Sequence, residues 1–277
     1  MRQLVMYIAY GIIAGFSQFT PLSASAHQAL FSMLFQFDSA WPMLRLCVHL
    51  GSLAALALVL RIRLAHIYRE MQLRLLPARS RKRPPDMDAV LDASISMMAI
   101  PPMLISAILT MFLYRSAPSL FSMAACLILS GVLIYIPDYL PGGDRRTGAM
   151  TRLEGFLFGI CAGLSVFSGF SAMGLMLSVG LLLKCDRTYL LELVLLICGV
   201  LLAELILADI VNIVITGFSG FTMRRLIGCF FAAVAAFGGG IAGIMMVRHL
   251  AVKTGFSGFA FYNWGLGLFS LILYLMV

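Results

Sequence analysis

Long, mostly apolar segments follow one another along the chain, separated by short polar connections. Two of them, Gln3–Phe37 and Gly155–Leu183, are interrupted near the middle by small and polar residues. Six others approach the length needed to cross a bilayer, whose hydrocarbon core of ~30 Å takes about 20 residues. They are Met43–Leu60, Ala93–Leu113, Leu120–Ile136, Thr188–Ile215, Leu226–Val247 and Thr254–Val277. The pattern predicts an all-α polytopic membrane protein with about six transmembrane helices in a single membrane domain, residues 1–277.

A sequence repeat relates the two interrupted segments. Residues Gly11–Ala24 (GIIAGFSQFTPLSA) and Gly159–Ala172 (GICAGLSVFSGFSA) are identical at eight of fourteen positions, at a constant offset of 148. Three predicted transmembrane helices lie between the copies, and an odd number gives the second copy the opposite orientation. This is the inverted-topology repeat, in which binding sites lie between the halves. We therefore predict a first half at residues 1–136 and a second at 153–277.

Each copy of the repeat contains residues that interrupt a helix. Pro21 lacks the N–H that a continuing helix needs, and the run 166–171 is small and polar around Gly169. Irregular backbone at membrane depth is tolerated only where protein or a water-filled cavity satisfies its polar groups. We therefore predict two re-entrant helix-turn-helix hairpins that line a polar cavity, at about residues 17–37 and 160–183.

Composition and charge exclude a soluble globular domain. The chain is 61% hydrophobic and 12% charged, with a mean hydropathy of +0.99, whereas soluble domains are about 25% charged. The net charge of +8 does not indicate nucleic acid, because eight of the twenty Lys and Arg lie between Arg61 and Arg83. Basic segments beside a membrane helix mark the cytoplasmic side. Residues 61–92 are therefore predicted to form a basic cytoplasmic loop.

Two further features of the sequence leave the predicted membrane domain unchanged and add no metal site to it. Arg2, the apolar run after it and Ala24–Ala26 imitate a cleavable signal peptide, but the repeat argues against removal of this segment. The six cysteines have no ligand spacing, and neither predicted hairpin contains a carboxylate. Since divalent cations prefer carboxylate oxygens, no metal site is predicted from the residues themselves.

The predicted turns collect groups that suit an anion. These groups belong to Gln18, Ser23, Ser25, His27, Ser168, Gly169 and Ser171. Backbone N–H groups at a helix start carry about half a positive charge, so a phosphate can bind there without many cationic side chains. The alternative is that the serines cap helices and that His27 bonds a backbone carbonyl. Both interpretations stay open at this point.

With these residues in view, the chain resembles the BacA/UppP family of undecaprenyl-pyrophosphate phosphatases. The family's first motif, Gly-x-x-Glu-Gly-x-Thr-Glu-Phe-x-Pro-x-Ser-Ser-x-Gly-His, is similar to Gly11–His27, and its second, Pro-Gly-x-Ser-Arg-Ser-Gly, to Ser168–Gly174. Weaker matches follow in family order at His49–Ala54, Ile100–Pro102, Arg187 with Glu192, and Phe259–Tyr262. The resemblance therefore covers nearly the whole chain.

The resemblance implies a multi-pass protein of the bacterial inner membrane, with a pyrophosphate in the cavity and a polyprenyl tail in lipid. It implies catalysis by His27 and Ser23, with a divalent cation, Mg²⁺ or Ca²⁺, if the chain is a working phosphatase. The substrate-binding residues it implies are Gln18, Ser25, Ser168, Gly169, Ser171 and Gly174. Expected partners are a polyprenyl phosphate lipid, the bilayer and a second copy of the chain in a homodimer.

The chain departs from the family at the positions that carry charge. Ala14 and Gln18 replace two acidic residues of the first motif, and Ala24 replaces one of its serines. Ala172 replaces the arginine of the second motif. A positioned acid or base contributes about 10²- to 10⁴-fold to a reaction. The sequence thus indicates a divergent member that lacks most of the catalytic residues.

Three functions follow as hypotheses. The first is a catalytically impaired member that binds or flips a polyprenyl phosphate. The second is an active undecaprenyl-pyrophosphate phosphatase in which Glu154, Glu192 or Asp209 supplies the missing carboxylates. The third is an unrelated secondary transporter, because inverted repeats with broken helices are common in transporters.

Overall fold

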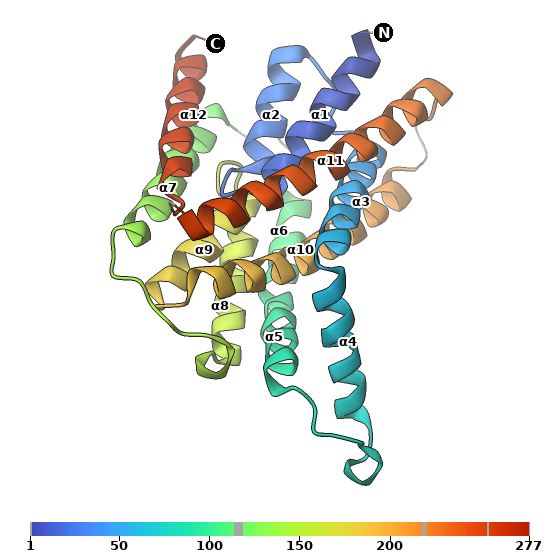
Figure 1. Ribbon diagram of the computed structural model, residues 1–277. Coiled ribbons are helices and arrows are strands. Elements are labelled where there is room, and N and C mark those ends of the chain that lie inside the picture. The colour runs from blue at the N-terminus through green and yellow to red at the C-terminus, as the bar shows by residue number, and fades with distance from the viewer. Residues whose placement is uncertain (1, 114–118, 218–219, 254, 277) are drawn as a thin grey trace.

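The computed structural model describes residues 2–113, 119–217, 220–253 and 255–276, and these residues form an array of helices (Figure 1). Six segments of this part of the chain are long and apolar enough to cross a membrane. They are α3 (Pro42–Val59), α5 (Met87–Met98) with α6 (Ile100–Leu113), α7 (Leu120–Asp138), α10 (Arg187–Thr216), α11 (Met223–Lys253) and α12 (Ser257–Met276). They coincide with the six predicted segments, which confirms an all-α polytopic membrane protein; Thr254 and Val277 of the last prediction lie outside the described residues.

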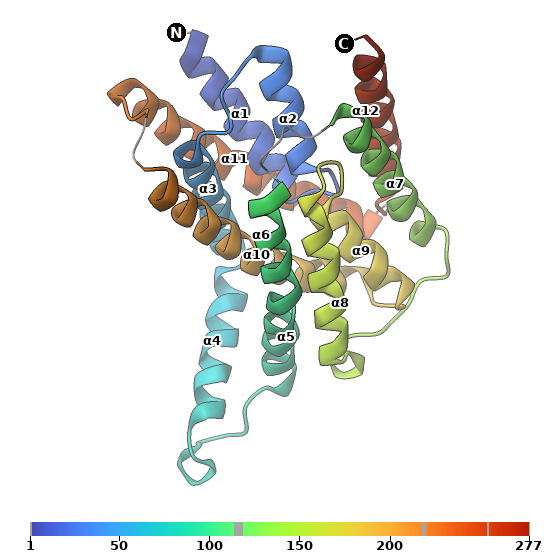
Figure 2. The ribbon, with the colours of Figure 1, turned by 180° about the vertical axis from the view of Figure 1, so that it is seen from behind.

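The two interrupted segments fold as helix-turn-helix hairpins. The first hairpin consists of α1 (Arg2–Gln18) and α2 (Ala24–Phe35), and the second of α8 (Arg152–Gly163), the short η3 (Leu164–Val166) and α9 (Ala172–Leu182). Figures 1 and 2 show them entering from opposite ends of the molecule, with their turns facing each other near its centre. The hairpins are longer than the predicted segments, because their first arms, α1 and α8, are complete helices. Their re-entry into a bilayer stays a prediction.

The helices pair in the same way in both halves. The helix α1 packs along α11, and α8 packs along α5 and α6, while α3 lies against α10 and α7 against α12. Gly11 of α1 has room for no side chain, since a Cβ there would lie 2.2 Å from the carbonyl oxygen of Ala232. A Cβ at its repeat equivalent, Gly159 of α8, would lie 2.4 Å from the carbonyl oxygen of Ala99. Repeat-related glycines thus bring repeat-related helices into backbone contact, as an inverted repeat requires.

The largest apolar cluster is built around α9 and the first half of α10. Met176 of α9 and Leu193, Val194 and Ile197 of α10 have no exposed surface. Because α9 is buried on nearly every side, its first turn is held inside protein. The second hairpin therefore meets the condition under which irregular backbone is tolerated at membrane depth.

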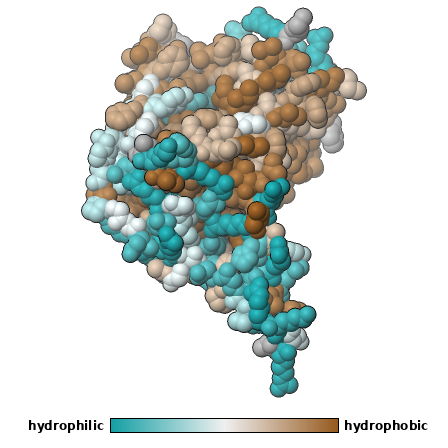
Figure 3. Space-filling model, viewed as in Figure 1, coloured by the Kyte–Doolittle hydropathy of each residue, from teal (hydrophilic) through white to brown (hydrophobic). Residues whose placement is uncertain are grey.

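The basic segment 61–92, predicted as a loop, is mostly helical. The helix α4 (Arg61–Leu75) continues from α3, a short turn η1 (Ala78–Ser80) follows, and α5 already begins at Met87. Arg, Leu, Gln, Met and Glu are strong helix formers, which explains the difference. Residues 61–86, which we call the α4 arm, project in Figure 1 from the end opposite both termini. Figure 3 shows hydrophilic side chains over that end. A last short turn, η2 (Thr147–Ala149), precedes the second hairpin.

Candidate functional site

The two turns use the same serine in the same way. Ser23 is the N-cap of α2 and accepts a hydrogen bond from the Ala26 N–H at 3.2 Å. Ser171, 148 residues later, is the N-cap of α9 and accepts one from the Gly174 N–H at 3.0 Å. Both serines therefore cap helices, as one of the two sequence interpretations held.

The capped ends of the two hairpins also bind each other. The Gly169 N–H donates to Ser23 Oγ over 3.0 Å, and Ser171 Oγ donates to the Thr20 carbonyl oxygen over 3.4 Å. Gly169 has a φ of +116°, which a residue with a Cβ rarely adopts. Ser23 and Ser171 are both buried. The structure thus joins Ser23, Gly169, Ser171 and Gly174 into one contact, which we call the tip contact.

The N-terminal ends of two helices converge at the tip contact. The helices α2 and α9 begin directly after Ser23 and Ser171. The N–H groups in the first turn of a helix have no partner within it, and the helix dipole makes that end positive. Two such ends side by side form an environment for an anion, although Ser23 and Ser171 already occupy one N–H of each helix.

His27 lies at the rim of the tip contact and is held at both ring nitrogens. Its Nδ1 lies 2.7 Å from the Ser23 carbonyl oxygen, and its Nε2 lies 2.8 Å from the hydroxyl of Tyr262 on α12. Because a carbonyl oxygen can only accept, Nδ1 carries the proton and, in the neutral ring, Nε2 accepts from Tyr262. Tyr262 is 48% exposed, so this pair faces the surface. Ser25 Oγ lies beside it, 3.2 Å from Ser23 Oγ.

Sequence reasoning missed two residues of α12 that complete this site. Asn263, fully buried, donates from Nδ2 to the Pro21 carbonyl oxygen over 3.1 Å, and its buried Oδ1 has no hydrogen bond from any described residue. Tyr262 holds His27 as described. The weak family match at Phe259–Tyr262 was the one signal in the sequence that pointed to this helix.

Two predicted site residues are not joined to this group. Gln18, at the end of α1, and Ser168, in the second turn, are half-buried. Among the described residues, no hydrogen bond connects either side chain to the tip contact.

The carboxylates considered as replacement ligands are bonded elsewhere. Glu154 pairs with Arg145 at 2.8 Å, and Glu192 pairs with Arg248 at 2.8 Å. Asp209 lies 2.7 Å from His49 Nδ1 and 3.2 Å from Arg45 Nε. Within the described residues, none of the three is hydrogen-bonded to His27. The prediction that they join His27 in a working site therefore finds no support in their contacts.

The donor set at the tips does not fit a divalent cation. It consists of serine hydroxyls, backbone carbonyl oxygens and one imidazole, whereas Mg²⁺ and Ca²⁺ favour carboxylate oxygens. In the part of the chain that the structure describes, no group of three or more His, Cys, Asp or Glu is placed to hold a metal ion. The groups at the tips suit an anion better than a cation.

Comparison with known proteins places these features in a family. Residues 7–269 match the family described as bacitracin resistance protein BacA. The chain is 25% identical over 275 residues to an undecaprenyl-diphosphatase of Desulforapulum autotrophicum, with 98% of each chain covered. It is 23% identical over 269 residues to undecaprenyl-diphosphatase 4 of Bacillus thuringiensis, covering 95% of this chain and 94% of the relative. An undecaprenyl-diphosphatase of a Nocardioides species is 26% identical over 187 residues, about two thirds of each chain.

Proposed function

The chain belongs to the BacA family, and on this premise we propose that it binds the pyrophosphate or phosphate of a polyprenyl lipid at the tip contact and hydrolyses it slowly or not at all. Relatives that match nearly the whole chain are named undecaprenyl-diphosphatases, and they come from bacteria. A multi-pass protein of this family would act in the bacterial inner membrane. Membership of the family also removes the hypothesis of an unrelated transporter.

The observation that carries the proposal is the hydrogen bond between Ser23 and Gly169, because it brings the N-terminal ends of α2 and α9 together. A phosphate at this point would meet first-turn N–H groups, the hydroxyl of Ser25 and the His27–Tyr262 pair at the rim. Leu164 and Phe167, in the turn of the second hairpin, are 38% and 43% exposed. These apolar side chains suit a polyprenyl chain that stays in lipid.

Impaired hydrolysis follows from what surrounds His27. Ala14 and Gln18 stand where the resemblance implies carboxylates, and Ala172 where it implies an arginine. One charge-assisted bond from arginine to phosphate is worth about 1.5 to 3 kcal/mol. A neutral site retains the dipoles that bind an anion but lacks the groups that stabilise a leaving phosphate. We propose accordingly that binding needs no divalent cation.

An active phosphatase is the second candidate, favoured by the names of the relatives and by the retention of Ser23 and His27. In that case the Nε2 lone pair of His27, which Tyr262 occupies, would have to be released when substrate enters. Flipping of the bound lipid, the other half of the first hypothesis, would require the tip contact to open, because the hydrogen bond between Ser23 and Gly169 joins the two hairpins there.

The test measures lipid binding and phosphate release on one purified sample in lipid nanodiscs. We expect undecaprenyl pyrophosphate to bind without added divalent cation and phosphate release to stay at background. The double variant Gln18→Glu with Ala172→Arg restores one acid and the arginine, and should raise release by about 10²-fold or more. Ser122→Ala, an exposed hydroxyl on α7, serves as control. Phosphate release by the unchanged protein that His27→Ala abolishes would establish the active phosphatase instead, and absence of binding would refute both.

A further inference from the structure

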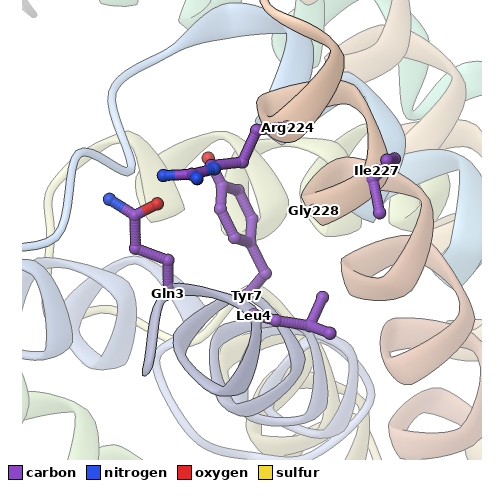
Figure 4. A pocket seen from close by; sticks show the side chains of 6 residues that line it. All are labelled: Gln3, Leu4, Tyr7, Arg224, Ile227 and Gly228. Atoms are coloured by element: carbon purple, nitrogen blue, oxygen red, sulfur yellow. The ribbon is translucent and has the colours of Figure 1, made fainter. Parts of the chain in front are cut away.

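A second candidate site lies at the far end of α1, away from the tip contact. Between the first turns of α1 and α11 there is an open cavity of about 330 Å³. Gln3, Leu4 and Tyr7 line it from α1, and Arg224, Ile227 and Gly228 line it from α11 (Figure 4). Gly228 makes the close approach possible, since a Cβ there would lie 2.5 Å from the Tyr7 ring. We call this cavity the α1–α11 groove.

The α1–α11 groove has a mostly apolar surface, and its few polar groups gather on one side. In Figure 4 the Arg224 guanidinium, the Gln3 amide and the Tyr7 hydroxyl gather on one side, and Leu4 and Ile227 lie on the other. Leu4 is 36% and Ile227 48% exposed. A headgroup beside a hydrocarbon chain has the same division of polarity. Side chains such as Leu4 and Ile227 would face the acyl chain of a lipid.

Charge at this end of the molecule is positive. The Arg224 side chain is exposed, and no ion pair or hydrogen bond joins it to any described residue. Arg225 pairs with Asp38 at 3.6 Å and lies over the Trp41 ring. The Arg224 cation is therefore available to an anion.

Aromatic residues place the α1–α11 groove at the depth of lipid headgroups. Tyr7 meets Phe37 edge-on at 5.1 Å, and Trp41 meets Phe221 at 5.4 Å. Tyr and Trp gather where membrane helices pass through the headgroup layer. The groove also lies at the first turn of α11, one of the six membrane-spanning candidates. A phosphate at Arg224 would then lie level with the phosphates of the surrounding bilayer.

We propose that the α1–α11 groove binds an anionic phospholipid, with its phosphate at Arg224 and an acyl chain along Leu4 and Ile227. The Gln3 amide and the Tyr7 hydroxyl add hydrogen bonds to the headgroup. This site is separate from the tip contact and does not depend on the function proposed for it. A polyprenyl phosphate shares the phosphate chemistry, so the experiment distinguishes the two lipids.

The test uses a tryptophan inside the groove as reporter. The chain has two tryptophans, so Ile227→Trp is made in a background of Trp41→Phe and Trp264→Phe. The protein is placed in bilayers of phosphatidylcholine mixed with phosphatidylglycerol. In one sample the phosphatidylcholine is brominated and in the other the phosphatidylglycerol, because bromine quenches tryptophan fluorescence. We expect the quenching to show that the groove binds phosphatidylglycerol about fivefold more tightly than phosphatidylcholine. This is the factor that one arginine contributes near an anionic surface. Leu4→Trp is a second reporter, in case a ring at position 227 fills the groove.

Two controls keep the result specific. Leu268→Trp, a 55% exposed position on α12, should show no preference between the lipids. Arg224→Gln should abolish the preference at position 227, whereas Arg152→Gln, which removes an exposed arginine at the start of α8, should leave it unchanged. Equal quenching by both lipids at positions 4 and 227, or a preference that survives Arg224→Gln, would overturn the proposal. Relief of quenching by a few mole per cent of unbrominated undecaprenyl phosphate, but not by the same amount of phosphatidylglycerol, would assign the groove to the polyprenyl lipid and overturn it too.

Discussion

Ser23 and Gly169, 146 residues apart in sequence, are joined by a hydrogen bond of 3.0 Å. The corresponding bond from Ser171 to the first hairpin uses different atoms. In the repeat, Pro21 is the equivalent of Gly169 and Ser171 the equivalent of Ser23. Proline has no N–H to donate, so Ser171 donates its own hydroxyl to the carbonyl oxygen of Thr20 at 3.4 Å. The tip contact is therefore asymmetric, with its shorter bond at Ser23.

Replacing the two serines should have unequal effects. Ser23→Ala removes a helix cap and leaves the buried Gly169 N–H without a partner, which costs about 1 to 3 kcal/mol. Ser171→Ala removes a helix cap and the longer hydrogen bond to the Thr20 carbonyl oxygen, which costs about 1 kcal/mol of stability. Thermal unfolding in detergent should show the larger decrease for Ser23→Ala, with Ser122→Ala unchanged. Equal losses would contradict the asymmetry.

Tyr262→Phe tests whether His27 and Tyr262, which we call the rim pair, bind the lipid. Loss of the hydroxyl leaves His27 Nε2 without its partner and should weaken polyprenyl phosphate binding by about two- to tenfold, the worth of one hydrogen bond. If the two side chains act together, His27→Ala combined with Tyr262→Phe should weaken binding little more than His27→Ala alone. Tyr274→Phe, at a tyrosine of α12 with the same 48% exposure, is the matched control. Fully additive losses would mean that the two residues act independently.

Close backbone packing makes Gly15 intolerant of a methyl group. A Cβ at Gly15 would lie 2.1 Å from the Ala236 carbonyl oxygen, so Gly15→Ala should force α1 and α11 apart and cost about 1 to 3 kcal/mol. Gly238, on α11 itself, has nothing within 4 Å of its Cβ position. Gly238→Ala should therefore raise stability by about 0.5 to 1 kcal/mol. Unfolding midpoints of the two variants should move in opposite directions, and a shift of both in one direction would show that α1 and α11 pack differently.

The α4 arm should respond to acid. Hydrogen bonds from Arg83, helped by the Asp86 N–H, lower the pKa of Glu70 from 4.5 to about 2. Because the folded pKa is the lower one, this pair stabilises the arm fully above pH 4.5, and the contribution is lost as the pH falls toward 2. Hydrogen exchange in residues 61–86, corrected for intrinsic rates, should increase over that interval. Glu70→Gln should make exchange faster at neutral pH and reduce its pH dependence, whereas Asp88→Asn should do neither. Part of the pH dependence should remain, because the hydrogen bond with His66 lowers the pKa of Asp86 as well.

Much of the architecture could be predicted because its causes are local. The length of the apolar segments decides how many helices can cross a bilayer, and Pro21 and Gly169 interrupt a helix wherever they occur. The fourteen-residue repeat identified both hairpins and the equivalence of Ser23 and Ser171. The error over residues 61–92 has a local cause as well, because basic charge was given more weight than the helix propensity of the same residues.

The partners of each side chain were decided only by the tertiary structure. Tyr262 reaches His27 across 235 residues, and Asn263 reaches Pro21 across 242. Glu192 and Asp209 belong to one helix, yet they pair with arginines on different neighbouring helices. The sequence by itself determined the helices, their interruptions and the repeat, since these depend on a residue and its near neighbours. The tip contact, the rim pair and the α1–α11 groove arise only when helices far apart in sequence pack together, because hydrogen bonds and ion pairs require atoms within about 3 to 4 Å.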